Sequence, residues 1–319
     1  TVSMYETEPT KPVILDLTLE LIDNMLIVNA PQEIKENDEV ISLIYKSVDY
    51  LKLICDQLLS ANCKVDGWTV GLRIVANDAT PEVLEALKTC GVPYTVYYDP
   101  KPDDFYLNRV YRAWNFAGSS SVYDNVCFVN SDMMFSPNWL SNLLKHHDGV
   151  SIPCSRLVES GKLRSGSYGV ERDFGKSPST LDQESFDSFA QDISEDNTQP
   201  GGLYMPCVFE TNKFRESGMY PEGNVFLDGD KLVAGYPNDR QVYMSGDDFF
   251  FRKLNSQFYM NHVTVFDSIV YHIQEGEKDD EKYIQKKYHK TEIFRWHSCN
   301  GSFNVRSIHT MDCSGCRQR

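Results

Sequence analysis

Short apolar runs alternate with segments of helical periodicity between residues 39 and 129, and this alternation constrains the fold more than any other feature. Apolar, β-rich runs occupy residues 40–45, 68–75, 94–98 and 125–129. Apolar spacing and helix-start residues predict intervening helices over residues 50–59, 81–90 and 108–117. Asp49 is expected to cap the first of these helices. This order predicts an α/β fold with a mainly parallel central sheet and helices on both faces.

Parallel sheets of this kind bind ligands beyond the carboxyl ends of their strands. The candidate ligand loops are therefore residues 46–49, 76–80 and 130–134. Beyond residue 150 the pattern is less regular. Residues 160–202 are rich in Ser, Gly, Asp and Glu, and this composition predicts a long, mobile insertion.

Charge and apolar patterning exclude several classes of protein. The chain has 31 Lys and Arg residues and 46 Asp and Glu residues, so its net charge is −15. Because nucleic-acid backbones are bound by clustered Lys and Arg, broad nucleic-acid binding is not expected. No apolar run approaches the roughly 20 residues of a membrane-spanning helix, and no secretory signal opens the chain. Six of the nine cysteines are scattered, mostly in apolar contexts, which predicts buried free thiols and a reducing, cytoplasmic compartment. Because the chain starts at Thr1 rather than Met, it is expected to be trimmed or part of a longer polypeptide.

Two acidic residues follow predicted strands of the first half. Asp132 comes directly after the fourth strand, where a carboxylate can coordinate a divalent cation such as Mg²⁺ or Mn²⁺. Alternatively, Asp132 only caps a turn or the next helix. Asp78 follows the second strand and can accept hydrogen bonds from a nucleobase or ribose. Taken alone, Asp78 is better explained by turn chemistry, since Asn-Asp-Ala-Thr-Pro is a good turn sequence.

The second half carries two further candidates. Asp247 and Asp248 precede a predicted aromatic helix, where a carboxylate can act as a general base or can simply complement the helix dipole. His272 follows a predicted strand over residues 263–271. A neutral imidazole is a good ligand for Mn²⁺, although a single histidine is more often structural.

Six segments stand in one order with regular spacing: VISLIYKSVDYLKLICDQLL, LRIVANDAT, VCFVNSDMMFSPNWL, LYMPCVFETNKFRESGMY, SGDDFFFRKL and VYHIQEG. This series resembles the family 2 glycosyltransferases of the GT-A fold, over residues 40–276. The resemblance implies a metal-dependent enzyme that moves a sugar from a nucleotide-sugar donor to a hydroxyl acceptor with inversion. The donor is expected to be a UDP-, GDP- or dTDP-sugar, the acceptor a glycan or another hydroxyl compound, and the cofactor Mn²⁺ or Mg²⁺.

On the donor side, the resemblance assigns roles to residues of three loops. Asp132 matches the metal-binding last Asp of the family's Asp-x-Asp motif, and Asn130 stands at its first position. Asp78 matches the acidic residue that contacts the nucleobase, and Ser47 to Asp49 lie in a loop that also touches it. Two positions differ from the family motifs. Asn130 stands where the family has an acidic residue, and residues 46–49 stand where the family usually has Pro-x-Tyr-Asn.

On the acceptor side, Asp247 matches the Glu and Asp248 the catalytic Asp of a Glu-Asp pair. Asp248 is therefore predicted to face the cleft as the general base, with Asp247 directed to solvent or to a backbone cap. Phe250 replaces the third acid of the family pattern. The resemblance also makes His272 a second metal ligand.

The chain is expected to be one large domain with an N-terminal extension over residues 1–38. Residues 39–150 would form the nucleotide-sugar-binding half, residues 151–278 the acceptor-binding half, and residues 279–319 a tail. Two other functions stay open: a GT-A-like module that binds a nucleotide sugar or glycan without turnover, and a nucleotidyltransferase. The last would need a Gly-rich phosphate loop near the N-terminus, and the sequence has none.

The tail is rich in Cys and His and is separate from the family resemblance. A structural Zn²⁺ site is one interpretation, and a frayed terminus with free thiols is the other. The candidate zinc ligands are His297, Cys299, His309, Cys313 and Cys316.

Overall fold

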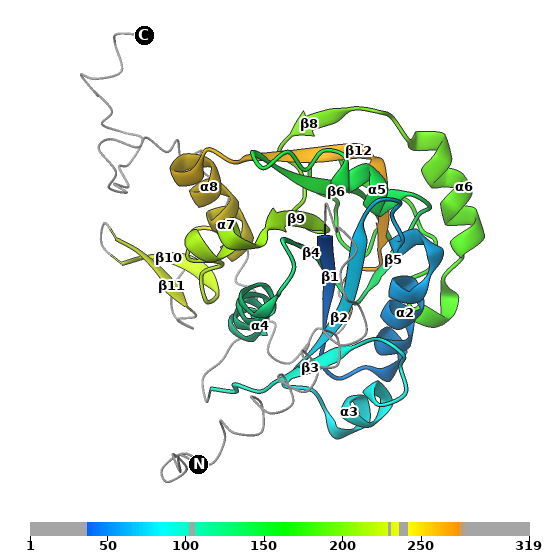
Figure 1. The fold of residues 1–319 in the computed structure, drawn as a ribbon, viewed down its shortest axis with the longest axis horizontal. Helices are drawn as coiled ribbons and strands as arrows, with labels where there is room; N and C mark the ends of the chain where they lie inside the picture. The colour runs from blue at the N-terminus through cyan, green and yellow to red at the C-terminus, as the bar shows by residue number, and fades with distance from the viewer. Residues whose placement is uncertain (1–36, 102–105, 229–230, 236–241, 275, 277–319) are drawn as a thin grey trace.

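The computed structural model describes residues 37–101, 106–228, 231–235, 242–274 and 276 (Figure 1). Its central sheet has the strand order β3-β2-β1-β4-β9-β6-β12-β5, with β7 beside β6 and β8 beside β12. The first four strands pair in parallel and are β1 (Asn37–Ile44), β2 (Thr69–Asn77), β3 (Tyr94–Tyr97) and β4 (Asn125–Val129).

The remaining strands extend this sheet from the other side of β4. One strand, β9 (Cys207–Glu210), runs antiparallel between β4 and β6 (Ser151–Glu159). The long strand β12 (Asn261–His272) pairs in parallel with β6 and antiparallel with β5 (Met133–Phe135). Thus β1, β2, β4, β6 and β12 all end at the same edge of the sheet. A separate antiparallel hairpin consists of β10 (Asn224–Asp228) and β11 (Lys231–Gly235).

Helices cover both faces of the sheet, as Figure 1 shows. Against one face lie α2 (Val48–Leu59), α3 (Pro81–Leu87) and α5 (Trp139–Leu144). Against the other lie α4 (Tyr106–Ser120), α7 (Thr211–Glu216) and α8 (Gly246–Phe258). Within β1, Val40 packs into the first layer and Ile41 into the second, because successive strand residues point to opposite faces. The predicted α/β class with a mainly parallel, two-sided sheet is confirmed.

Local sequence explains most helix starts, with one correction. Thr80 caps α3 through its side chain, and Pro81 takes the first helical position. The cap of α2 is Ser47, whose hydroxyl accepts the Tyr50 N–H, whereas Asp49 lies inside the first turn. The sequence pattern favours Asp49 at this position, so this expectation is corrected. Either residue suits the position chemically, and the extended backbone of Ser47 decides between them.

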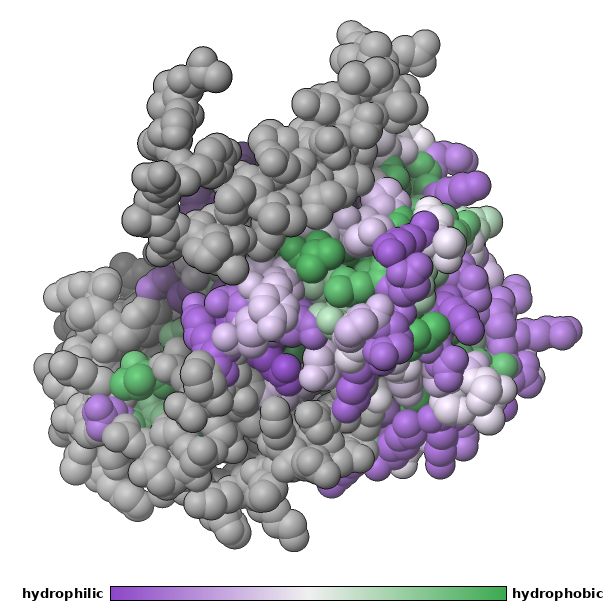
Figure 2. All heavy atoms as spheres, turned by 90° about the horizontal axis from the view of Figure 1, so that it is seen from below, coloured by the Kyte–Doolittle hydropathy of each residue, from purple (hydrophilic) through white to green (hydrophobic). Residues whose placement is uncertain are grey.

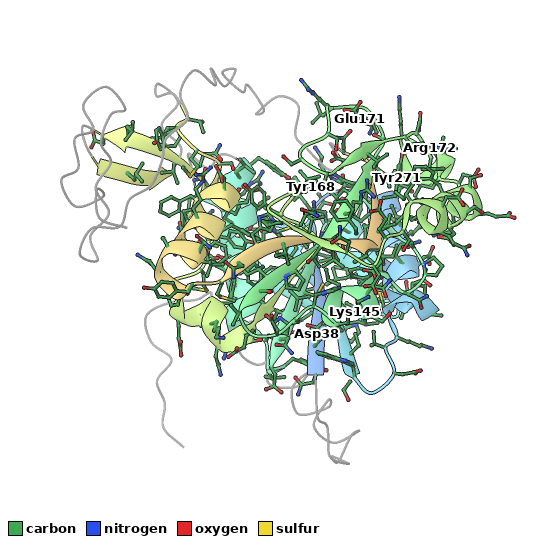
Figure 3. All side chains as sticks on the ribbon, turned by 90° about the horizontal axis from the view of Figure 1, so that it is seen from above. Asp38, Lys145, Tyr168, Glu171, Arg172 and Tyr271 are labelled. Carbon is green, nitrogen blue, oxygen red and sulfur yellow. The ribbon has the colours of Figure 1, made fainter. Side chains whose placement is uncertain are left out.

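The segment over residues 160–202 contains more regular structure than its composition indicated. It includes β7 (Val170–Glu171), a 3₁₀ turn, α6 (Gln183–Ile193) and β8 (Thr198–Pro200). Phe174 and Phe186 pack against the ring of Tyr271 on β12, which is labelled in Figure 3. The Tyr271 hydroxyl donates to the Gly175 carbonyl. Part of the segment is therefore packed on the sheet, which corrects the interpretation of the whole stretch as a loop. The mobility of the segment stays a prediction.

Several other expectations concern the cysteines, membrane-spanning helices and the two ends of the chain. The six cysteines in the described part of the chain carry free thiols, and all but Cys90 are buried, as predicted. Among the described residues, no helix is both long and apolar enough to span a membrane. The proposed zinc ligands of the tail lie outside the described residues. The strand β1 begins at Asn37, so its first two residues fall within the predicted N-terminal extension over residues 1–38.

A carboxyl group is buried at the amino end of β1. The Asp38 side chain is fully buried there (Figure 3). Burial and the neighbouring Glu39 carboxylate raise the pKa of Asp38 to about 8, although the Glu39 backbone N–H opposes them. Because the unfolded group has a pKa near its ordinary value of about 3.9, the folded protein binds an extra proton between these two values. Stability therefore falls as the pH rises through this window.

We expect Asp38→Asn to remove this pH dependence. Above pH 5, the stability of the wild type should fall with pH by up to about 1.4 kcal/mol per pH unit more than that of the variant. Denaturant unfolding at pH 5, 6.5 and 8 measures the difference. Asp56→Asn, at an exposed position of α2, is the matched control. Parallel stability curves for wild type and Asp38→Asn would show that Asp38 is ionised in the folded protein.

Candidate active site

A cavity of about 460 Å³ opens at the carboxyl edge of the sheet. Its walls include Tyr45 after β1, Asn77 at the end of β2, Asp132 after β4, Glu159 at the end of β6 and His272 at the end of β12. These residues meet because parallel strands deliver their carboxyl ends to one edge. The strand β1 runs downward in Figure 1, so its carboxyl end lies at the bottom of that view. Figure 2 shows the molecule from below and therefore looks onto this edge. Apolar and hydrophilic side chains lie next to each other there.

Asp132 and His272, the two predicted metal ligands, lie side by side in this cavity. The His272 Nε2 atom is 3.3 Å from Asp132 Oδ2. Backbone pairing causes this approach: His272 is opposite Met133 in the β12–β5 ladder, and the Ile273 N–H donates to the Asp132 carbonyl at 3.0 Å. The Gly276 N–H also donates to Asp132 Oδ2, at 3.1 Å. A third side chain, Glu159, holds the other ring nitrogen, with its Oε1 3.0 Å from His272 Nδ1.

The charges of these three side chains depend on one another. Burial lowers the pKa of His272, but the Asp132 and Glu159 carboxylates outweigh it and raise the pKa to about 9. Burial also acts to raise the pKa of both carboxyls, yet contact with His272 leaves each pKa below its ordinary value. Without another cation, His272 is therefore an imidazolium between two carboxylates.

The donor set fits a divalent cation. Ligands about 2.1 Å from an octahedral ion, at right angles to each other, lie about 3 Å apart, close to the observed 3.3 Å between Asp132 Oδ2 and His272 Nε2. Glu159 takes the position of the carboxylate that accepts the outer N–H of a metal-bound histidine. It would hold His272 in the tautomer that exposes Nε2 to the ion.

Glu159 is a residue of the site that the sequence pattern does not single out. Its only local signal is its place at the end of a buried strand of a parallel sheet, which is the same signal that singled out Asp132 and His272. What identifies Glu159 is its partner: it lies opposite His272 in the β6–β12 ladder, 113 residues away in sequence.

Asp247 is the acidic residue of α8 that lines the cavity. Its carboxylate accepts a hydrogen bond from the Tyr111 hydroxyl, and its backbone N–H donates to the same oxygen at 3.1 Å. Burial raises the pKa of Asp247, although the hydrogen bond from Tyr111 acts against it. A carboxylate with a raised pKa, facing a cavity, is a better proton acceptor than an exposed one.

Asp248 points elsewhere, which corrects the predicted orientation of the pair. Its Oδ1 accepts from Arg252 Nε at 2.8 Å and from the Tyr204 hydroxyl at 3.0 Å, and Asp248 does not line the cavity. Helix geometry explains the difference. Asp248 and Arg252 are four residues apart and share one face of α8, whereas Asp247 is rotated by about 100° from Asp248.

The predicted donor-side residues divide into two groups. Asn130 and Asp132 line the cavity. Ser47, Asp49 and Asp78 do not: Ser47 caps α2, and Asp78 Oδ1 accepts the Asp99 N–H at 2.9 Å. The residues beside them reach the cavity instead, namely Tyr45 and Asn77. The nucleotide contacts expected of Ser47, Asp49 and Asp78 stay predictions.

Comparisons with known proteins give structural similarity without sequence similarity. No protein-family model and no curated protein matches the chain. Similar solved structures include the mannosyltransferase PcManGT from Pyrobaculum calidifontis in complex with GDP-Man and Mn²⁺, with a TM-score of 0.46 and 11% identity over 82% of this chain. Another is GalNAc-T7 with UDP, GalNAc and Mn²⁺, with a TM-score of 0.44 and 11% identity over 83% of this chain. A mycobacterial protein has a TM-score of 0.45 and 13% identity over 86% of this chain and 75% of its own.

This chain spans 66% of the mannosyltransferase chain and 53% of the GalNAc-T7 chain. The assignment of a function therefore depends on the residues of the cavity.

We expect Glu159→Gln to weaken Mn²⁺ binding by about 10- to 100-fold, because loss of a carboxylate behind a metal-bound histidine has that effect in other sites. His272→Ala and Asp132→Ala should weaken it further, since they remove ligands. Isothermal titration with Mn²⁺ measures the affinity, and circular dichroism checks the fold. Glu184→Gln, at an exposed position of α6, is the control. Unchanged Mn²⁺ affinity in all three site variants would disprove this metal site.

Proposed function

We propose that the chain is a metal-dependent glycosyltransferase, which moves a sugar from a nucleotide-sugar donor to a hydroxyl acceptor. The observation that carries the proposal is the convergence of Asp132, His272 and Asp247 on one cavity. The reaction needs two things on opposite sides of the sugar carbon: neutralisation of a leaving diphosphate and removal of a proton from the acceptor. The cavity contains a candidate for each.

On the donor side, Asp132 and His272 would hold the divalent cation. When bound, such an ion neutralises the charge that develops on the leaving diphosphate. An imidazole ligand favours Mn²⁺ over Mg²⁺, which prefers oxygen ligands alone. Arg109 and Arg164 also line the cavity and add positive charge near an anionic donor.

On the acceptor side, Asp247 would accept the proton. As the acceptor hydroxyl oxygen attacks the anomeric carbon, its proton passes to the Asp247 carboxylate and the bond from that carbon to the diphosphate oxygen breaks. A single displacement of this kind inverts the anomeric configuration. Asp248, the base expected from the sequence, would instead position Tyr204 and Arg252, with which it is hydrogen-bonded.

One observation favours a second candidate function, a module that binds a nucleotide sugar without turnover. Asn130 lines the cavity at the position where the family has an acidic residue, so the site has one carboxylate fewer than the family motif. Such a site would still bind a donor.

The test is a panel of UDP-, GDP- and dTDP-sugars, each offered with Mn²⁺ and with EDTA. Thermal shift reports binding, and release of nucleoside diphosphate reports turnover. The enzyme proposal requires Mn²⁺-dependent release from at least one donor. Binding without release, even with hydroxyl acceptors present, would favour the binding module, and neither binding nor release would reject both.

We expect Asp247→Asn to lower turnover by about 10²- to 10⁴-fold with little change in donor affinity, because the amide keeps its shape but cannot accept the proton. Asp248→Asn is the matched control on the neighbouring position and should cost much less. Steady-state transfer rates at saturating donor decide between the two. A larger loss in Asp248→Asn would restore the assignment of the base that the family resemblance implies.

A further inference from the structure

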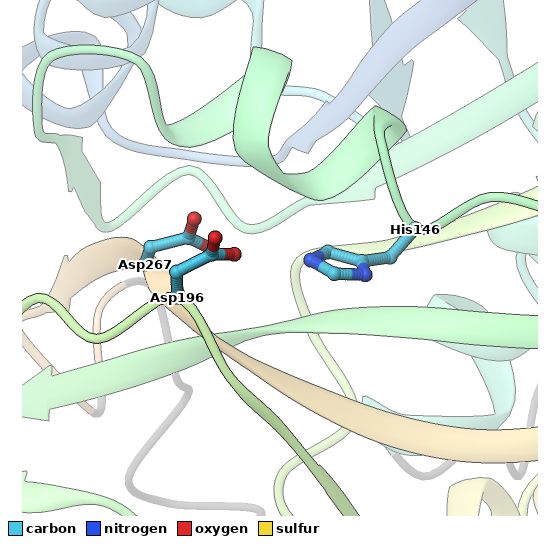
Figure 4. Close-up of side chains that lie close together, drawn as sticks. All are labelled: His146, Asp196 and Asp267. Atoms are coloured by element: carbon cyan, nitrogen blue, oxygen red, sulfur yellow. The ribbon is translucent and has the colours of Figure 1, made fainter.

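A second group of possible metal ligands lies away from the cavity. His146 follows α5, Asp196 follows α6, and Asp267 lies in β12 (Figure 4). One ligand atom from each residue falls within 4.8 Å of those of the other two. In Figure 4, the ring nitrogen of His146 that is farther from the backbone, Nε2, points toward the two carboxylates. None of the three residues lines the cavity.

Two atoms of this cluster are buried and lack a hydrogen-bond partner. They are Asp267 Oδ1 and His146 Nε2. The Asp267 side chain is only 9% exposed, so its unpaired oxygen is shielded from water. A buried polar atom without a partner is destabilising, and so its persistence calls for an explanation such as a bound ion.

The backbone around the cluster is held in place before any ion binds. The register of β12 against β6 shifts between Val265 and Ile269, and this bulge contains Asp267. The Asn142 side chain donates to the Asp267 carbonyl at 2.7 Å, which ties the bulge to α5. The Phe266 N–H donates to the Asn197 carbonyl at 2.9 Å, which ties it to the segment of Asp196.

Lys145 is the cation already present beside the carboxylates. Its Nζ contacts Asp196 Oδ1 at 2.7 Å and Asp267 Oδ2 at 2.6 Å. These contacts use one oxygen of each carboxylate and leave the other, Asp196 Oδ2 and Asp267 Oδ1, for a further ligand. Two carboxylates and one ammonium carry a net charge of −1, which still attracts a divalent cation. Lys145 would then fix the carboxylates from the outer side.

We propose that His146, Asp196 and Asp267 form a second divalent-cation site, of the class that binds Zn²⁺. One imidazole nitrogen and two carboxylate oxygens are ligand types that Zn²⁺ accepts, and water would complete a tetrahedron. Ca²⁺ prefers oxygen ligands alone and should bind poorly. The ion would join the ends of α5 and α6 to the bulge of β12, so its role is structural and does not depend on the proposed reaction.

The decisive experiment locates the ion. Crystals of the full chain are grown with millimolar Zn²⁺ and measured above and below the zinc absorption edge. We expect an anomalous peak within about 2.3 Å of His146 Nε2 and of Asp267 Oδ1. The peak should be absent in His146→Ala. A crystal without a peak at this cluster would overturn the proposal, whatever is found at Asp132 and His272.

A solution measurement covers the case in which His146→Ala does not fold. Zn²⁺ at 100-fold excess over its Kd should raise the Tm of the wild type by about 5 °C. Asp196→Asn changes an exposed side chain (82% exposed) and should reduce this rise, whereas Asp192→Asn, on the exposed face of α6, should not. If Zn²⁺ raised the Tm of the wild type and of Asp196→Asn equally, a Zn²⁺ site at this cluster would be contradicted. The same holds if Ca²⁺ raised the Tm of the wild type as much as Zn²⁺ does.

Discussion

The candidate active site depends on the parallel pairing of β12 with β6. That ladder places His272 opposite Glu159, and the antiparallel addition of β5 on the other side of β12 brings Asp132 to the free ring nitrogen. If β12 slipped by one residue, His272 would move to the opposite face of the sheet. The register is well defined because the side chains of β12 pack into two different layers, Val270 in one and Tyr271 in the other. A slip would exchange them and disrupt the packing of both layers.

Burial of charge is the second constraint on this molecule. Most buried ionic groups have a partner of opposite charge: Arg73 Nε lies 2.9 Å from Glu39, and His272 lies between two carboxylates. In the part of the chain that the structure describes, Asp247 has no cationic partner and is held by the Tyr111 hydroxyl instead. Burial therefore leaves its pKa raised. A carboxyl that faces a cavity and keeps a raised pKa is the arrangement that a proton acceptor needs.

One strand contributes to both proposed sites. The regular end of β12 supplies His272 to the cavity, and the bulge earlier in the same strand turns Asp267 toward the ends of α5 and α6. A bulge redirects a side chain without disturbing the pairing on either side of it. The segment over residues 160–202 connects the two regions, since Arg164 lines the cavity and Asp196 follows the helix that packs beside Tyr271.

The sequence by itself determined the α/β class, the first four strands within a few residues, and the candidacy of Asp132, Asp247 and His272. These features depend on local periodicity, on a position at the end of a strand or, for Asp247, on a position at the start of a helix. The tertiary structure alone decided that Glu159 supports His272, and that Asp247 rather than Asp248 lines the cavity. Pairing between strands more than a hundred residues apart leaves no local pattern, and the direction of a helix side chain depends on how the whole helix is rotated against its sheet. Both depend on packing, which no single stretch of sequence contains.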